Sequence, residues 1–156
     1  MNTMVRKKKI ALAVPLFLAL VLAASTAAAH CEIPCGIYDD RMRTETIAED
    51  ATTVEKAMKM IDELSKEEPV NYNQLVRWIT NKEEHADRIQ HAVSQYFMTQ
   101  RISPGTDNYE KKVVVLHKML VAAMKCKQTT DLSHVETLRA LLKEFEILYF
   151  GHSHRE

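Results

Sequence analysis

The sequence predicts an all-α protein, an antiparallel up-down four-helix bundle preceded by an irregular N-terminal segment. Three observations carry this prediction. Apolar residues recur at steps of three and four in four successive segments, which is the pattern of an amphipathic helix. The connections between these segments are short and rich in turn residues, and only Gly105 and Gly151 occur beyond the N-terminal segment. No stretch alternates between apolar and polar residues as a strand does.

The first two helices are predicted from long apolar stripes. The first stripe consists of Ile47, Ala51, Val54, Met58 and Ile61. It ends before Glu67-Glu68-Pro69, because proline disfavours helix in the residue that precedes it. The second stripe consists of Tyr72, Leu75, Ile79, Ala86, Ile89, Val93 and Tyr96, with Lys82 in its one polar position. The seven-residue spacing within the stripes favours nearly parallel packing of the helix axes.

The third and fourth helices follow a turn at Ser103-Pro104-Gly105. The third stripe consists of Tyr109, Val113, Leu116, Leu120 and Ala123, and the fourth of Val135, Leu138, Leu142, Phe145 and Tyr149. Asp107 with Glu110, and Ser133 with Glu136, have the spacing of residues that cap a helix start. Gly151 is a predicted helix stop.

Residues 1–29 have the composition of a cleaved signal peptide. A basic cluster, Arg6 to Lys9, precedes a fifteen-residue apolar run, and Ala27-Ala28-Ala29 satisfies the A-x-A cleavage pattern. The run is shorter than the roughly 20 residues of a spanning helix, although an uncleaved membrane anchor is the alternative. Cleavage after Ala29 predicts an exported protein, periplasmic or secreted, that begins at His30 and has no membrane contact.

Charge sets a further limit on function. The whole chain has 21 basic and 21 acidic residues, and the leader contains four of the basic ones and none of the acidic ones. The remaining chain has 17 basic and 21 acidic residues, hence a net charge of −4 with neutral histidines. Its sequence contains no basic stripe of the kind that binds nucleic acid.

The segment that begins the predicted mature chain, "HCEIPCGIYDD", is rich in metal donors. A free amine on His30, the Cys31 amide and the Cys31 thiolate can close two fused five-membered chelate rings. Cys35 can supply a second thiolate after the turn at Pro34, and the His30 imidazole is an axial donor. A planar set of two nitrogens and two sulfurs suits Ni(II) or Cu(II), whereas zinc prefers tetrahedral sites. The alternative is a local Cys31–Cys35 disulfide, which is common in exported proteins.

This segment closely resembles the H-C-x-x-P-C-G-x-Y hook of nickel superoxide dismutases, and every fixed position of that motif is matched. The resemblance implies one nickel ion, bound by the amine and imidazole of His30, the amide and thiolate of Cys31 and the thiolate of Cys35. It implies disproportionation of superoxide to oxygen and hydrogen peroxide with nickel alternating between +2 and +3. It also implies a homohexamer, a cis peptide bond at Pro34, and Tyr38 lining the access to the metal.

Three positions depart from the pattern of this family. Glu32 stands where the family commonly has aspartate, and its longer arm can shift a contact around the metal. The family orients the histidine ligand with a glutamate early in the first helix, for which Glu45 is the nearest candidate, although a gapless count gives Thr46. His85 falls about where the family has a second orienting residue, an arginine.

The remaining polar residues have ordinary structural explanations. A charge-rich stretch of the second helix, Glu83 to His91, contains no Glu-x-x-His or His-x3-His pattern, so it is interpreted as a solvated face or a polar subunit contact. Cys126 is interpreted as a free thiol at a helix end, and His152 and His154 as part of a frayed tail.

The sequence thus predicts three parts: a cleaved signal peptide at 1–29, a nickel-binding hook at 30–38 and a four-helix bundle domain at 39–156. The leading hypothesis is an exported nickel superoxide dismutase that acts on superoxide. The alternatives are a non-enzymatic exported protein that binds nickel or copper, and a structural bundle with a Cys31–Cys35 disulfide.

Overall fold

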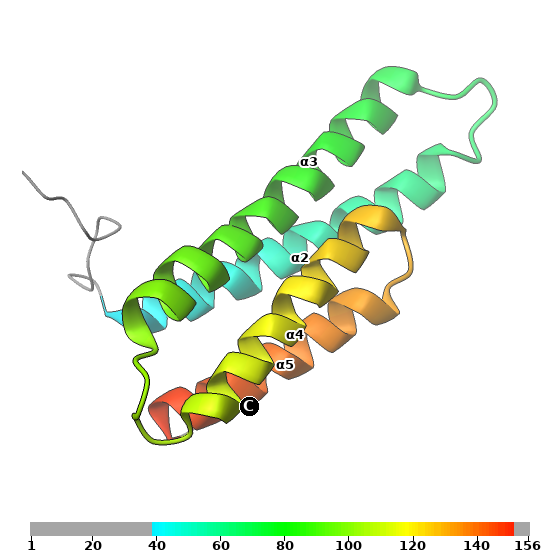
Figure 1. Ribbon diagram of the computed structural model, residues 1–156. Helices are drawn as coiled ribbons and strands as arrows, with labels where there is room; N and C mark the ends of the chain where they lie inside the picture. The colour runs from blue at the N-terminus through cyan, green and yellow to red at the C-terminus, as the bar shows by residue number, and fades with distance from the viewer. Residues whose placement is uncertain (1–38, 152–156) are drawn as a thin grey trace, which may run out of the picture. The chain divides into compact units, whose positions relative to one another are not determined.

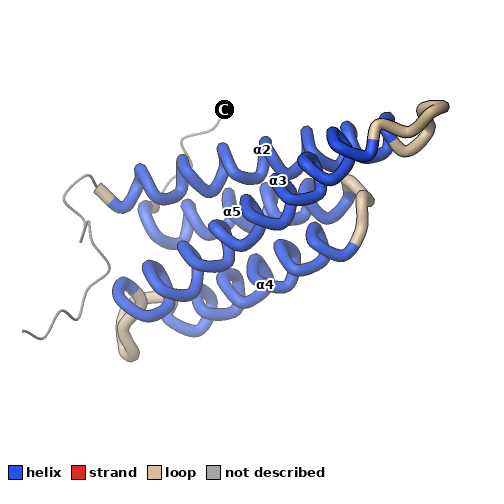
Figure 2. Tube along the Cα trace, turned by 90° about the horizontal axis from the view of Figure 1, so that it is seen from above, coloured by secondary structure: helices blue, strands red, loops and turns tan. Residues whose placement is uncertain are grey.

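The computed structural model describes residues 39–151, which form four helices joined by short loops (Figure 1). The helices are α2 (Asp40–Leu64), α3 (Tyr72–His91), which continues into the π-helix η1 (Ala92–Arg101), α4 (Tyr109–Gln128) and α5 (Ser133–Phe150). Between residues 39 and 151 there is no strand, as Figure 2 shows. The prediction of an all-α four-helix bundle is therefore confirmed.

The four helices run up and down around one core. Each helix packs against the next along the chain, and α5 returns to pack against α2. The buried members of the predicted stripes meet in this core, and the fully buried ones include Val54, Met58, Ile89, Leu116 and Phe145. Burial of these side chains is the main stabilising contribution, since an isolated helix of this length is only marginally stable in water.

The second stripe is buried only in its later half. Tyr72 is 71% exposed and Ile79 is 40% exposed, whereas Ala86, Ile89, Val93 and Tyr96 are all fully buried. The prediction that Tyr72 and Ile79 belong to the core is therefore wrong. The physical reason is that α3 begins well beyond the end of α4. Lys82, ten residues after the start of α3, contacts the carbonyl of Cys126 in the last turn of α4.

The helix ends agree with the sequence in two places and differ in two. Gly151 adopts a left-handed conformation (φ 82°) and ends α5, and Gly105 (φ 83°) lies in the predicted turn, so both predictions are confirmed. By contrast, α5 is capped by Asp131, whose Oδ1 accepts from the Ser133 backbone N–H at 2.9 Å, and not by the Ser133 side chain. Likewise α4 begins after Asn108, in a left-handed conformation, rather than at Asp107.

The π-helix η1 was not predicted. Its side chains bond across five residues, as from Thr99 Oγ1 to the Ser94 carbonyl at 2.8 Å, and the Ile102 backbone N–H reaches the Phe97 carbonyl at 3.0 Å. This wider turn places Tyr96 and its neighbour Phe97 in the core together. Phe97 packs edge-to-face on Phe145, with ring centroids 4.8 Å apart, and closes the end of the core that lies next to the start of α2.

Candidate metal centre

The predicted metal ligands precede the part of the chain that the structure describes. The predicted residues that lie outside residues 39–151 are His30, Cys31, Glu32, Pro34, Cys35 and Tyr38. The structure does describe the end of the bundle to which they are joined. It begins at Asp39, the residue that directly follows Tyr38.

Asp40 is the centre of a polar cluster at the start of α2. Its carboxylate accepts hydrogen bonds from the hydroxyls of Tyr149, at 2.6 Å, and Tyr96. It also forms an ion pair with Arg101, whose Nε lies 3.0 Å from Asp40 Oδ1. Arg101 in turn donates to the Tyr96 hydroxyl at 2.9 Å. We call these four residues the Asp40 cluster, and they fix the start of α2 to η1 and α5.

The π-helix is what allows this cluster to form. Tyr96 and Arg101 are five residues apart, and in an α-helix that spacing would point the two side chains in different directions. In η1 the backbone repeats across five residues, so both side chains reach the same carboxylate. A π-helix at this place fits the general observation that such distortions accompany functional sites.

The cluster determines the ionisation of its members. Burial by itself would raise the pKa of Asp40, but the hydroxyls of Tyr149 and Tyr96 and the charge of Arg101 outweigh burial, so this pKa lies below its ordinary value. The pKa values of Tyr149 and Tyr96 are raised, first by burial and then by the hydrogen bond to Asp40. Asp40 is therefore an anion and both phenols remain hydrogen-bond donors around neutral pH.

His85 lies in a second polar network, between α2 and α3. Its Nδ1 lies 2.6 Å from Oδ1 of Asp50, which is only 5% exposed, and its Nε2 lies 2.7 Å from Nη2 of Arg88. Since a guanidinium can only donate, Nε2 must accept and Nδ1–H must donate to Asp50. The interpretation of residues 83–91 as a solvated face holds for Glu84, Asp87, Arg88 and His91, which are exposed, but not for His85.

The structure does not bring Glu45 and His85 together as a pair. Glu45 is exposed on α2, and the carboxylate that contacts His85 is that of Asp50. Sequence reasoning missed Asp50, although it stands next to Ala51 in the buried stripe, where a carboxylate needs a partner. It also missed the Asp40 cluster, for which the signal was two tyrosines at stripe ends, because a buried phenol seeks a hydrogen-bond acceptor.

Cys126, the third cysteine, lies in the core and is a free thiol. Burial raises the pKa of this thiol to about 11, so that it stays protonated at neutral pH and is a poor metal ligand. Its backbone carbonyl accepts a hydrogen bond at 3.0 Å from the ammonium group of Lys82, which is 5% exposed. Lys82 also donates to the Lys127 carbonyl, and thus caps the C-terminal end of α4.

Two features are absent from the described bundle, residues 39–151. Among residues 39–151 there is no group of three or more His, Cys, Asp or Glu side chains that could hold a metal ion. None of the helices in the same range has the length and apolarity needed to cross a membrane.

Comparison with known proteins identifies the chain. The family model described as nickel-containing superoxide dismutase matches residues 25–153, which is most of the sequence and includes both the hook and the bundle. No curated protein and no solved structure matches the chain. The chain therefore belongs to the nickel-containing superoxide dismutase family and is an oxidoreductase that uses nickel.

Proposed function

We propose that the hook, residues 30–38, holds the nickel ion of this superoxide dismutase, one per subunit. The observation that carries the proposal is the complete H-C-x-x-P-C-G-x-Y motif within the matched family range. The donor chemistry supports it. Cys126 is buried and protonated, which leaves Cys31 and Cys35 as the thiolates, and anionic sulfur donors stabilise a higher oxidation state of a late transition metal.

In the proposed site, His30 provides its terminal amine and its imidazole, Cys31 its amide and thiolate, and Cys35 its thiolate. When bound, nickel supplies a one-electron couple between +2 and +3, so that one superoxide is oxidised to oxygen and a second, with two protons, is reduced to hydrogen peroxide. The chain contributes ligand identity, orientation and restricted access. Tyr38 lines the access, and Glu32 supplies a negative charge next to the first cysteine.

The Asp40 cluster has a positioning role in this proposal. Asp40 follows Tyr38 by two residues, and three side chains from η1 and α5 bind its carboxylate. A hook joined to such a fixed residue loses less conformational entropy when it closes around a metal ion than a hook joined to a frayed helix end. Glu45 remains a predicted contact of the His30 imidazole, whereas both ring nitrogens of His85 already have partners in Asp50 and Arg88.

We further propose that residues 1–29 are removed, that the protein is exported to the periplasm or the medium, and that its subunits form a homohexamer. Removal of the leader is required by the chemistry, because the amine of His30 is free only after cleavage at Ala29. Family membership favours the enzyme over a non-enzymatic carrier of nickel or copper. A Cys31–Cys35 disulfide is the alternative that the same experiment excludes.

The test is mass spectrometry of the purified mature chain, with metal analysis and superoxide decay measured on the same sample. We expect His30 as the first residue, one nickel per chain, reduced cysteines and rapid decay. A chain that retains Ala29 should lack nickel-supported activity. Full activity in a preparation that still carries Ala29, or an active chain with a Cys31–Cys35 disulfide, would contradict the proposed site.

A further inference from the structure

The hairpin between α2 and α3 extends beyond the other two helices. Lys82 Nζ contacts the Cys126 carbonyl at 3.0 Å, which places Lys82 beside the last turn of α4. Because α3 and α4 are antiparallel, the ten residues of α3 before Lys82 lie past the end of α4, over a length of about 15 Å. Asp62 accepts from the Thr130 hydroxyl at 2.8 Å, so the α4–α5 loop is level with the end of α2. Figure 1 shows this projection, which we call the hairpin tip and define as residues 62–81.

One face of the hairpin tip is apolar and exposed. Tyr72 is 71% exposed, Val76 is 60% exposed and Ile79 is 40% exposed. Their spacing of four and three residues places them on the same side of α3. An exposed tyrosine beside two aliphatic side chains has the composition of the centre of a protein interface rather than that of an ordinary surface.

The hairpin tip is also acidic. It contains four carboxylates, Asp62, Glu63, Glu67 and Glu68, against two cations, Lys66 and Arg77, hence a net charge of −2. Glu63, Glu67 and Glu68 are exposed. Two such tips packed against each other would bring like charges together, which disfavours a symmetric tip-to-tip contact. The face therefore fits a partner surface that is apolar and cationic.

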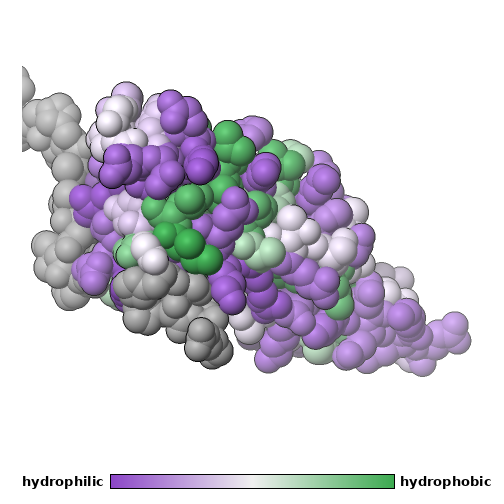
Figure 3. Space-filling model, turned by 90° about the horizontal axis from the view of Figure 1, so that it is seen from below, coloured by the Kyte–Doolittle hydropathy of each residue, from purple (hydrophilic) through white to green (hydrophobic). Residues whose placement is uncertain are grey.

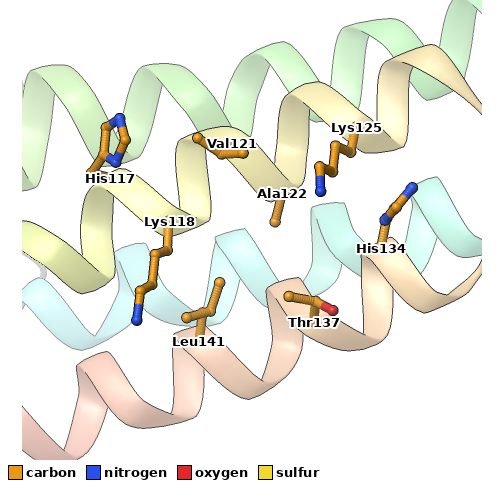
Figure 4. A pocket seen from close by; sticks show the side chains of 8 residues that line it. All are labelled: His117, Lys118, Val121, Ala122, Lys125, His134, Thr137 and Leu141. Carbon is orange, nitrogen blue, oxygen red and sulfur yellow. The ribbon is translucent and has the colours of Figure 1, made fainter.

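A groove between α4 and α5 has this complementary character. Its volume is about 320 Å³, and its lining residues are His117, Lys118, Val121, Ala122, Lys125, His134, Thr137 and Leu141. No carboxylate is among these eight described residues, and Lys118 and Lys125 are both exposed. Figure 4 shows Ala122 and Leu141 between Lys118 at one end and Lys125 at the other. The groove thus offers an apolar floor between two cations.

The wider surface is mixed. On the face drawn in Figure 3, apolar side chains gather on the body of the bundle, and the projecting end is hydrophilic, in keeping with the exposed carboxylates of the hairpin tip. On α4 and α5 the exposed large apolar residues are Val114, Met124 and Ile147. None of these three residues lines the α4–α5 groove, whose apolar floor is formed by Val121, Ala122 and Leu141.

We propose that the hairpin tip of one subunit binds in the α4–α5 groove of a second copy of this chain. Tyr72 and Val76 lie on the apolar floor, and the carboxylates of the tip lie near Lys118 and Lys125. The contact joins two different surfaces, and repetition of such a contact builds a closed ring when the rotation between neighbouring subunits divides a full turn. It specifies the surfaces of the self-association proposed above and does not depend on the nickel chemistry.

The test is a charge exchange, with the mass of the purified protein measured by analytical ultracentrifugation. The tip variant carries Glu67→Lys and Glu68→Lys, the groove variant carries Lys118→Glu and Lys125→Glu, and a third variant carries all four. We expect each double variant to weaken association at least about tenfold, because like charges then face each other. The fourfold variant restores opposite charges and should return the wild-type mass. Higher salt should weaken the wild-type assembly.

The matched control is Glu49→Lys with Lys143→Glu, two exposed residues that line a different groove between α2 and α5, and it should keep the wild-type mass. Circular dichroism should show a native helical spectrum for every variant, because all the changed side chains are exposed. A monomeric wild-type protein would overturn the self-association. The assigned surfaces would be wrong if neither double variant weakens the assembly, or if the fourfold variant does not restore it. Nickel content and superoxide decay test the enzyme separately.

Discussion

Asp50 and His85 form a partly buried polar contact between α2 and α3, with Oδ1 of Asp50 2.6 Å from Nδ1 of His85. Arg88 donates to the other ring nitrogen, so each polar atom of the imidazole has one partner. Such a contact fixes the ring orientation and tautomer of His85, because each nitrogen can play only one role. This relationship makes His85 a well-ordered side chain and not one that moves freely on the helix surface.

Replacing Asp50 by alanine should destabilise the bundle by about 1 kcal/mol, because it removes the acceptor of the partly buried Nδ1–H of His85. Urea denaturation of the variant and of the wild type measures this loss. Glu49→Ala, at the adjacent exposed position, is the control and should change stability by less than about 0.5 kcal/mol. In a double variant with His85→Ala the two losses should be clearly less than additive; additive losses would show that the two residues do not interact.

The helices could be predicted from the sequence because the apolar residues of each stripe lie on one face of a helix, and that face is buried. Ile47 to Met58 and Val135 to Phe145 are buried as their spacing indicates. The contact between Asp50 and His85 could not be predicted, since it depends on the relative register of two helices. The exposure of Tyr72 has the same origin, because the sequence does not state how far one helix extends past another.

The π-helix and the Asp40 cluster could not be predicted for a different reason. Backbone hydrogen bonds between residues five apart hardly change the spacing of the apolar residues, which still fits steps of three and four. Val93 and Tyr96 fit the expected stripe, and only the burial of Phe97 beside Tyr96 departs from it. The motif of the hook, by contrast, is local in sequence, which is why residues 30–38 could be interpreted without any knowledge of the bundle.

Asp40→Asn should destabilise the protein at neutral pH, and the difference from the wild type should shrink in acid. The pKa of Asp40 is lowered from its ordinary value of 3.8, so the ionised carboxylate is more stable in the folded protein than in the unfolded chain. That contribution is present above about pH 4 and is lost as the pH falls through the folded pKa. Urea denaturation at a series of pH values between neutral and pH 3 measures it.

Asp39→Asn is the matched control for this pH series. Asp39 is exposed and its Oδ1 accepts from the Arg41 backbone N–H at 3.3 Å, a capping role that asparagine fills about equally well. The control should follow the wild type throughout. A difference between Asp40→Asn and the wild type that is equally large at pH 7 and pH 3 would mean that the charge of Asp40 does not stabilise the fold.

Lys82→Met should destabilise the end of α4, because methionine keeps the apolar stem but cannot donate to the carbonyls of Cys126 and Lys127. We expect a loss of about 1–3 kcal/mol in the free energy of unfolding, from urea denaturation monitored by circular dichroism. Lys66→Met, at an exposed position, should have almost no effect. Equal stabilities of the two variants would exclude a capping role for Lys82.

Cys31→Ser and Cys35→Ser should each abolish superoxide disproportionation, because each removes one thiolate from the proposed nickel site. The helical spectrum should persist, since the described core is built from residues 47–149. Cys126→Ser is the control and should keep nearly full activity, because that thiol is buried and protonated. Loss of the helical spectrum together with the metal in Cys31→Ser or Cys35→Ser would instead favour a structural disulfide.

His30→Gln is the sharpest test of the proposed mechanism, because it keeps the terminal amine and both thiolates and removes only the imidazole. The remaining donors, the amine, amide and thiolate of residues 30 and 31 and the thiolate of Cys35, would still be able to hold Ni(II). What should be lost is stabilisation of the oxidised metal. We expect the rate of superoxide decay to fall by about a hundredfold or more, the usual loss when one electrostatic stabiliser leaves a preorganised site. Pulse radiolysis or stopped-flow measurement, with nickel analysis of the same preparation, gives both quantities. A variant that keeps nickel and turns over at the wild-type rate would show that the imidazole of His30 takes no part in the redox cycle.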